Sequence, residues 1–149
     1  MDGTDLKILK LLQIDSTLPA SDIAKKVGLS TSPCWKRISR LREQGLIKQQ
    51  VALLDASKLG FGLTAYVSIK TGEHSGDWLK TFSQTVTQMP EVMEFHRMAG
   101  DVDYMLKVIV EDIEAFDEFY KRLIGSSAIS EVTSRFSMEK IKETTELPI

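Results

Sequence analysis

Residues 30–45 have the sequence STSPCWKRISRLREQG, and this stretch marks both ends of a helix. Ser30 suits the N-cap because its hydroxyl oxygen can accept a backbone N–H that has no partner within the helix. Pro33 falls in the first turn, where a missing N–H does no harm, and Gly45 suits the left-handed residue that ends a helix. At about 100° per residue, apolar and cationic side chains fall on opposite sides of this helix.

The cationic side of this helix suits a place in the DNA major groove. Hydroxyl groups and cations near a helix N-terminus can contact phosphates and base edges there. The residues expected to contact DNA are Ser30, Thr31, Ser32, Trp35, Lys36, Arg37, Arg40 and Arg42. A surface helix that is merely solvated has the same pattern, and packing at the helix edge is the simpler use of Trp35. The flanking sequence therefore has to decide between the two interpretations.

The flanking residues favour a helix-turn-helix. Residues 2–13 have the leucine spacing of a first helix. Pro19 opens a second helix over residues 20–27, and Gly28 ends it just before the cationic helix. Two short helices joined by a tight glycine turn are the signature of a helix-turn-helix. Residues 46–54 are rich in apolar and β-branched side chains, which predicts a strand and hence a winged helix-turn-helix.

Charge divides the chain into two parts. Residues 1–60 have ten Lys and Arg against six Asp and Glu, a net charge of +4. Residues 61–149 have nine against fifteen, a net charge of −6. Together with the glycines and polar residues that precede position 62, this predicts a DNA-binding domain over 1–60 and a second domain over 61–149. No apolar run approaches the roughly 20 residues of a membrane span, and no signal peptide is visible, so a cytoplasmic location without membrane contact is expected.

The second part alternates strands and helices. Strands are expected at 63–71, 92–98, 104–110 and 129–140, with helices at 76–88 and from 112 onward. This β-α-β-β-α-β order predicts a ferredoxin-like sandwich and an α+β chain overall. Two helices cover only one face of such a sheet. Because Tyr66, Met105 and Thr133 leave the other face partly apolar, we expect it to pair with a second subunit.

Residues for catalysis or metal binding are not apparent. The chain has no Gly-rich phosphate loop and no nucleophile elbow, and His74 and His96 lack partners at metal-ligand spacing. Cys34 could be a redox-sensitive thiol beside cations, but it shares a face with Ile38, which favours a small buried side chain. We therefore expect no enzyme activity, no metal and no cofactor.

Three stretches resemble the Lrp/AsnC (feast/famine) family of transcriptional regulators. They are LKILKLLQ at 6–13, the VGLS-x-x-P run ending at Pro33, and the turn Gly100-Asp101-Val102-Asp103-Tyr104. The resemblance spans essentially the whole chain, with the C-terminal half of the RAM type. The details SPCWKR, VALLD, DEFYKRL and LPI look closest to the DecR-like branch, some of whose members answer to cysteine.

The resemblance implies dimers formed through the C-terminal sheet, tetramers of dimers (octamers), and a free amino acid as effector bound between adjacent dimers. By this resemblance the effector-binding residues are Met98, Gly100, Asp101, Asp103, Tyr104, Thr133 and Ser134. Backbone N–H groups in a turn can hold a carboxylate, and an Asp can accept from an ammonium group. Taken without the family, the same turn is simply a hairpin connection.

A ligand-responsive, DNA-binding regulator is thus the expected function. The alternative is a stand-alone amino-acid-binding regulatory module that acts on an enzyme partner. RNA binding through the sheet would need aromatic residues on central strands within a basic motif, and residues 105–110 offer none.

Overall fold

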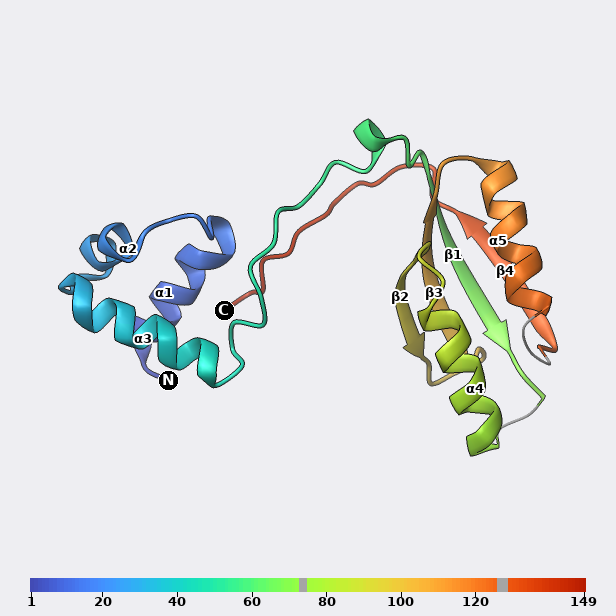
Figure 1. Ribbon diagram of the computed structural model, residues 1–149, viewed down its shortest axis with the longest axis horizontal. Coiled ribbons are helices and arrows are strands. Elements are labelled where there is room, and N and C mark those ends of the chain that lie inside the picture. Colours follow the sequence, from blue (N-terminus) through green and yellow to red (C-terminus); the bar gives the residue numbers. More distant parts are fainter. Residues whose placement is uncertain (73–74, 126–128) are drawn as a thin grey trace. The chain divides into compact units, whose positions relative to one another are not determined.

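The computed structural model describes residues 1–72, 75–125 and 129–149, which form two compact units (Figure 1). The helical unit is Met1–Leu53 with Ile141–Ile149, and the sheet unit is Leu54–Lys140. The division expected at residue 60 differs from this grouping in two places. Residues 54–60 belong with the sheet, and residues 141–149 belong with the helices.

Gln13 holds the tail to the helical unit. Its Nε2 donates to the carbonyl oxygen of Leu147 at 3.0 Å, and its Oε1 accepts from the N–H of the same residue at 3.0 Å. One side-chain amide thus satisfies both backbone groups of a residue that lies 134 positions away. This pairing resembles one step of a β-ladder, with the glutamine amide in place of a second strand.

The helical unit contains the three expected helices, α1 (Gly3–Ile14), α2 (Ala20–Val27) and α3 (Thr31–Glu43). Asp2 caps α1 through the backbone N–H groups of Thr4 and Asp5. Gly28 has a φ of 72°, the left-handed conformation that makes the turn between α2 and α3 possible. Ser30 occupies the N-cap position of α3, but its hydroxyl makes no capping hydrogen bond, so the expected cap interaction is wrong.

The core of the helical unit is small. Its buried residues come from all three helices: Ile8, Leu12, Ile23, Ala24, Cys34, Ile38 and Leu41. Cys34 is fully buried among them, which confirms the interpretation as a packing residue. Burial raises the pKa of its thiol, with the charge of Arg37 acting in the opposite direction, so the reactive thiolate form is disfavoured.

The strand expected over residues 46–54 is absent. Within the described residues this segment pairs with no other strand, and most of its apolar side chains are exposed, Leu53 by 73% and Leu54 by 75%. A strand requires a ladder partner for its backbone groups, and β-branched composition alone does not provide one. The predicted strand is therefore wrong, because the described residues provide no ladder partner for this segment.

The sheet unit has the expected β-α-β-β-α-β order (Figure 1). Its strands are β1 (Leu63–Lys70), β2 (Val92–Arg97), β3 (Tyr104–Val110) and β4 (Glu131–Phe136), with α4 (Gly76–Thr87) and α5 (Ile113–Gly125) on one face. The strand order is β2-β3-β1-β4 and every pair is antiparallel. A single 3-10 turn, Ser57–Leu59, precedes β1 in the described chain.

β4 is shorter than the strand expected over 129–140. Its ladder with β1 runs from Glu131 to Phe136, and the N–H of Ser137 adds one more bond to the carbonyl of Thr64 at 2.9 Å. β1 begins at Leu63, so residues beyond 137 have no strand left to pair with. The length of a strand is set by its neighbour, which the period-2 pattern does not reveal.

The open face of the sheet is more polar than expected. Lys107 bonds to Glu94 at 3.0 Å, and Arg135 donates to the hydroxyl of Ser68 at 3.1 Å. The hydrogen bond from Lys107 is the main cause of the lowered pKa of Glu94. Tyr66 remains 43% exposed at the centre of the face.

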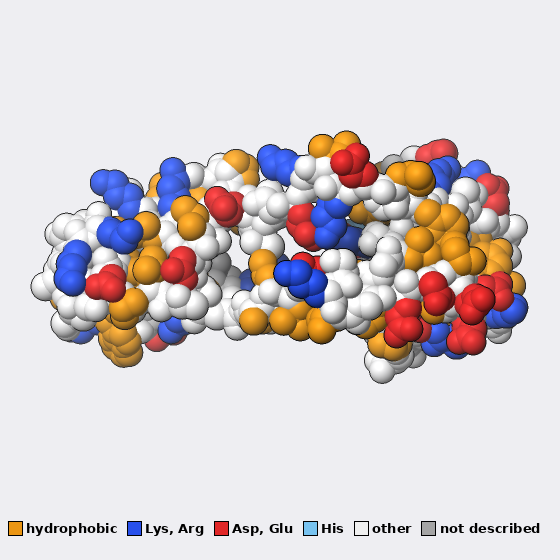
Figure 2. Space-filling model, turned by 90° about the horizontal axis from the view of Figure 1, so that it is seen from above, with side chains coloured by type: hydrophobic (Ala, Val, Ile, Leu, Met, Phe, Trp, Pro, Cys, Tyr) orange, Lys and Arg blue, Asp and Glu red, His pale blue; other side chains and the backbone are white. Residues whose placement is uncertain are grey.

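Acidic side chains gather on the sheet unit at the right of Figure 2, while Lys and Arg side chains stand out on the helical unit at the left.

Candidate nucleic-acid interface and effector site

The first half of α3 and its N-cap residue form an exposed surface. Ser30, Thr31, Ser32 and Lys36 are exposed, and Trp35 is exposed by 59%. Lys36 has no carboxylate within ion-pair distance among the described residues. These side chains sit in the first half of α3, where hydroxyl groups and a cation can reach a groove.

The arginines of α3 have partners within the helical unit. Arg37 donates to Asp2 Oδ2 at 2.7 Å and to Asp5 Oδ1 at 2.8 Å, and Arg40 donates to Asp5 Oδ2 at 2.9 Å. The side chain of Asp5 is only 1% exposed, so α3 is fastened to the first turn of α1 through a buried carboxylate. Arg42 donates to Gln50 Oε1 at 2.7 Å, and the Nε2 of Gln50 donates to the carbonyl of Ser16.

The charges of this cluster reinforce one another. The backbone N–H of Asp5 and the side chain of Arg37 lower the pKa of Asp2 to about 2. Burial acts to raise the pKa of Asp5, but the hydrogen bonds from the N–H of Asp2 and from Arg37 outweigh it and the pKa is lowered. Both carboxyl groups are therefore ionised at neutral pH, and they hold Arg37 and Arg40 in place.

The turn between β2 and β3 is held by Asp103. Its carboxylate accepts from the N–H of Thr71 at 2.8 Å, and its own N–H donates to the carbonyl of Ile69 at 2.9 Å. Its carbonyl accepts from the N–H of Met98 at 2.8 Å, which closes the turn. Gly100 has a φ of 134°, a conformation that L side chains rarely adopt. Asp103 therefore stabilises the turn through three hydrogen bonds.

The other residues expected around the effector are placed differently from one another. Asp101 is exposed at the tip of the turn, whereas Tyr104 is 4% exposed and packs toward the helices. Thr133 lies opposite Ser68 on the open face of the sheet, and Ser134 lies opposite Val67 on the helix-covered face. Because neighbours on a strand point to opposite faces, Thr133 and Ser134 cannot both line one cavity of a single subunit.

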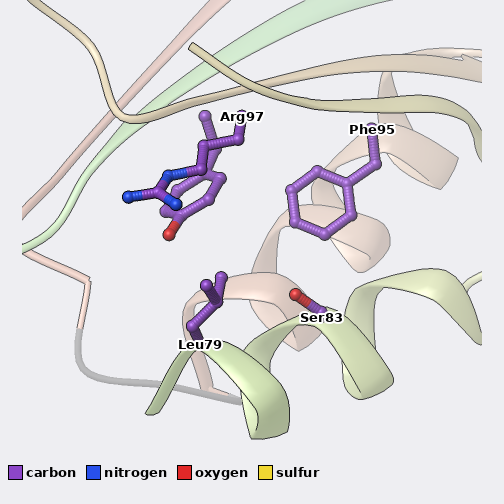
Figure 3. Close-up of a pocket in the computed structure, with 5 residues that line it drawn as sticks. Leu79, Ser83, Phe95 and Arg97 are labelled. Carbon is purple, nitrogen blue, oxygen red and sulfur yellow. The ribbon is translucent and has the colours of Figure 1, made fainter. Parts of the chain in front are cut away.

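A pocket of about 310 Å³ lies beside this turn, between β2 and α4. Figure 3 shows Phe95 and Arg97 extending from β2 toward Leu79 and Ser83 of α4. Tyr104 of β3 also lines the pocket. Arg97 and Tyr104 are opposite each other in the ladder at the two ends of the turn. The pocket therefore combines an apolar lining with one cation and two hydroxyl groups.

Sequence reasoning identified Tyr104 but missed the other four pocket residues. A signal was available: Phe95 and Arg97 are two positions apart on one strand, so they share a face with each other and with the apolar residues of β3. Leu79 and Ser83 are four apart on α4 and also share a face. His74, to which no role was assigned, lies outside the described residues. No group of three potential metal ligands occurs among the residues that are described.

Comparison with known proteins agrees with this architecture. The family model for the Lrp/AsnC ligand binding domain matches residues 64–147, and that for a winged helix-turn-helix DNA-binding domain matches residues 1–48. The chain belongs to the Lrp/AsnC family. The match to the ligand binding domain covers β1 to β4 and the pocket, and the helix-turn-helix match covers α1 to α3.

Relatives in the Lrp/AsnC family match over most of their length. The chain is 53% identical to the DNA-binding transcriptional activator DecR of Escherichia coli, over 100% of this chain and 99% of that one. It is 46% identical to a glutamate uptake regulatory protein of Zymomonas mobilis, over 100% and 91%. An AsnC family regulator from Agrobacterium tumefaciens superposes with a TM-score of 0.96 at 57% identity, over 99% and 97% of the two chains.

One structural relative was solved with a ligand. A transcriptional regulator from Neisseria meningitidis in complex with L-methionine has a TM-score of 0.94 and 32% identity to this chain, over 99% of this chain and 96% of that one. The fold that this chain shares with that protein therefore occurs in a regulator that binds a free amino acid.

Proposed function

We propose that this protein is a transcriptional regulator that binds duplex DNA through α3 and responds to a free amino acid. The family membership and the paired helix-turn-helix and ligand binding domains carry this proposal. Relatives are regulators by name, which also argues against enzyme activity. The alternative, a module without DNA binding that acts on an enzyme, has no support in these relatives.

The exposed residues of α3 provide the DNA contacts in this proposal. Thr31, Ser32, Trp35 and Lys36 reach the groove, and Arg37 and Arg40 hold the helix at its angle through Asp5 while their outer edges face solvent. Lys36→Gln should weaken binding to the cognate duplex. It should also reduce the slope of log K against log salt concentration by about 1, as expected for the loss of one phosphate contact. A matched control is Lys25→Gln, because Lys25 is exposed but bonds to Asp22 at 3.2 Å.

The pocket beside the β2–β3 turn is the effector site in this proposal. Arg97 would donate charge-assisted hydrogen bonds to the α-carboxylate, and Leu79 and Phe95 would contact the side chain of the amino acid. Asp101, which is exposed in the adjoining turn, would accept from the ammonium group. The expected partners are therefore an amino acid, duplex DNA and further copies of this chain. The copies would form dimers through the open face of the sheet, and four dimers would form an octamer. Of the described helices, none is long and apolar enough to span a membrane, and we propose a cytoplasmic location.

A thermal-shift screen of the twenty amino acids tests the effector. The true ligand raises the melting temperature by mass action. Arg97→Gln should abolish the shift, while Lys121→Gln, an exposed control on α5, should leave it intact. A shift that persists unchanged in Arg97→Gln would place the amino acid elsewhere.

A further inference from the structure

Three lysines of the helical unit surround a hollow that the DNA-contacting surface does not include. Lys7, Lys10 and Leu11 of α1 line it together with Lys26 and Val27 of α2, and its volume is about 370 Å³. Lys7 and Lys10 are three positions apart and so lie on one face of α1. The hollow thus has an apolar floor and three ammonium groups around it.

These lysines lack the partners that the arginines of α3 have. Among the described residues, no carboxylate oxygen lies within ion-pair distance of Lys7, Lys10 or Lys26. The charge of Lys26 acts on Asp15 from a distance, but the carboxylate of Asp15 is held by the hydroxyl of Thr17 at 2.6 Å. Three cations without a carboxylate partner in the described chain therefore lie together at α1 and α2, apart from Lys36 and Arg42 of α3, whereas Arg37 and Arg40 are paired with carboxylates.

A multivalent anion fits this arrangement. Three like charges around one hollow repel one another, and a ligand with several negative oxygens removes that repulsion. Lysine stems can lie along the floor made by Leu11 and Val27 while the flexible ammonium groups adjust to phosphate oxygens. A planar carboxylate, in contrast, is matched by the fixed fork of an arginine, and the hollow has none.

We propose that the Lys7–Lys10–Lys26 hollow binds phosphate groups, either those of a DNA backbone or those of a free polyphosphate. The DNA source rests on the proposed DNA-binding function, and the polyphosphate source does not. On DNA, the hollow would add sequence-independent contacts to those made by α3, so it would contribute affinity and salt dependence but no base preference.

The first experiment measures duplex binding by fluorescence anisotropy at several salt concentrations, with the full-length protein. The test variant combines Lys7→Gln, Lys10→Gln and Lys26→Gln. A control variant removes three lysines that already have carboxylate partners, through Lys25→Gln, Lys58→Gln and Lys121→Gln. If the hollow holds DNA phosphates, the test variant should bind about tenfold more weakly or worse, with a salt slope lower by about 2 to 3, while the control matches the wild type.

The second experiment measures the melting temperature with sodium tripolyphosphate. A shift present in the wild type and absent from the test variant supports a phosphate site, even if duplex binding is unchanged, and then assigns it to a free polyphosphate. A variant with Lys7→Arg, Lys10→Arg and Lys26→Arg keeps the charge and should behave as the wild type in both assays. It also separates loss of charge from loss of folding.

If the test variant keeps the wild-type salt slope and the wild-type response to tripolyphosphate, the proposal is overturned. A wild-type protein that binds no duplex at low salt would refute the DNA-binding function instead. In that case the tripolyphosphate response alone would still decide whether the hollow binds phosphate.

Discussion

The two units of this protein are stabilised in different ways. In the helical unit a carboxylate, Asp5, is as buried as the apolar core and joins α1 to α3 through two arginines. In the sheet unit the comparable position is taken by stacked and edge-on rings, with Phe82 at their centre. Charge therefore adds to the apolar core in orienting the helices of the first unit, whereas aromatic packing orients those of the second. Acid and salt should act mainly on the unit that we propose binds DNA.

The largest effect should come from the aromatic core. Phe82 is fully buried, and its ring centroid lies 4.8 Å from that of Trp78 and 5.4 Å from that of Tyr104. Phe82→Ala should lower the free energy of unfolding of the sheet unit by about 3–5 kcal/mol. Hydrogen exchange resolved by peptide should show faster exchange in β1 to β4 and unchanged exchange in α1 to α3. Equal loss in both units would mean that they unfold together.

Asp5→Ala should have a smaller effect, confined to the helical unit. The substitution leaves Arg37 and Arg40 without their buried partner, but both guanidinium groups can still reach water, so a loss of about 2 kcal/mol is expected. Hydrogen exchange in α1 and α3 measures it. The control Asp22→Ala removes an exposed carboxylate and should change stability by less than about 0.5 kcal/mol. If the two variants behave alike, the buried carboxylate does not stabilise the unit.

Acid should weaken the helical unit through the same cluster. The N–H of Asp5 and the guanidinium of Arg37 lower the pKa of Asp2 from its usual 3.8 to about 2 in the folded protein. The ionised carboxylate of Asp2 therefore contributes its full stabilisation of the folded state above about pH 4, and this contribution is lost as the pH falls toward 2. Urea midpoints from hydrogen exchange or circular dichroism between pH 5 and 2.5 measure the loss. Asp2→Asn should flatten the dependence of stability on pH. If that dependence is unchanged, ionised Asp2 does not stabilise the helical unit.

The smallest effect is expected at the β2–β3 turn. Gly100→Ala would place a side chain at a φ of 134° with nothing within 4 Å of the added carbon, so strain alone is introduced. A loss of about 1–2 kcal/mol is expected for the sheet unit. Gly72→Ala, at a glycine without positive φ, should be neutral or slightly stabilising in the same thermal melts. A neutral Gly100→Ala would show that the turn relaxes to another conformation.

Sequence predicted the parts of this fold that depend on near neighbours. Gly28 and Pro19 mark the helix-turn-helix locally, and alternation along β1 and β3 marks the sandwich. What it missed depends on partners far along the chain. Asp5 meets Arg40 across 35 positions, and residues 46–54 needed a strand partner that the described part of the chain does not supply.

The candidate site was predictable to a similar extent. The turn at Gly100 was found through its composition and its family resemblance. The pocket beside it combines β2 with α4, so no single stretch of sequence contains it. The structural tasks of Asp103, Arg37 and Arg40 were also hidden, because a charged residue looks the same in a sequence whether it meets solvent or a partner.

The hydrogen bonds between Gln13 and Leu147 bear on any attempt to study the DNA-binding half by itself. A fragment that stops near residue 60 would contain α1, α2 and α3, but the side-chain amide of Gln13 would then bond to water instead of Leu147. Dividing the chain between the two units, as the order of its motifs suggests, would therefore discard residues 141–149, which belong to the helical unit.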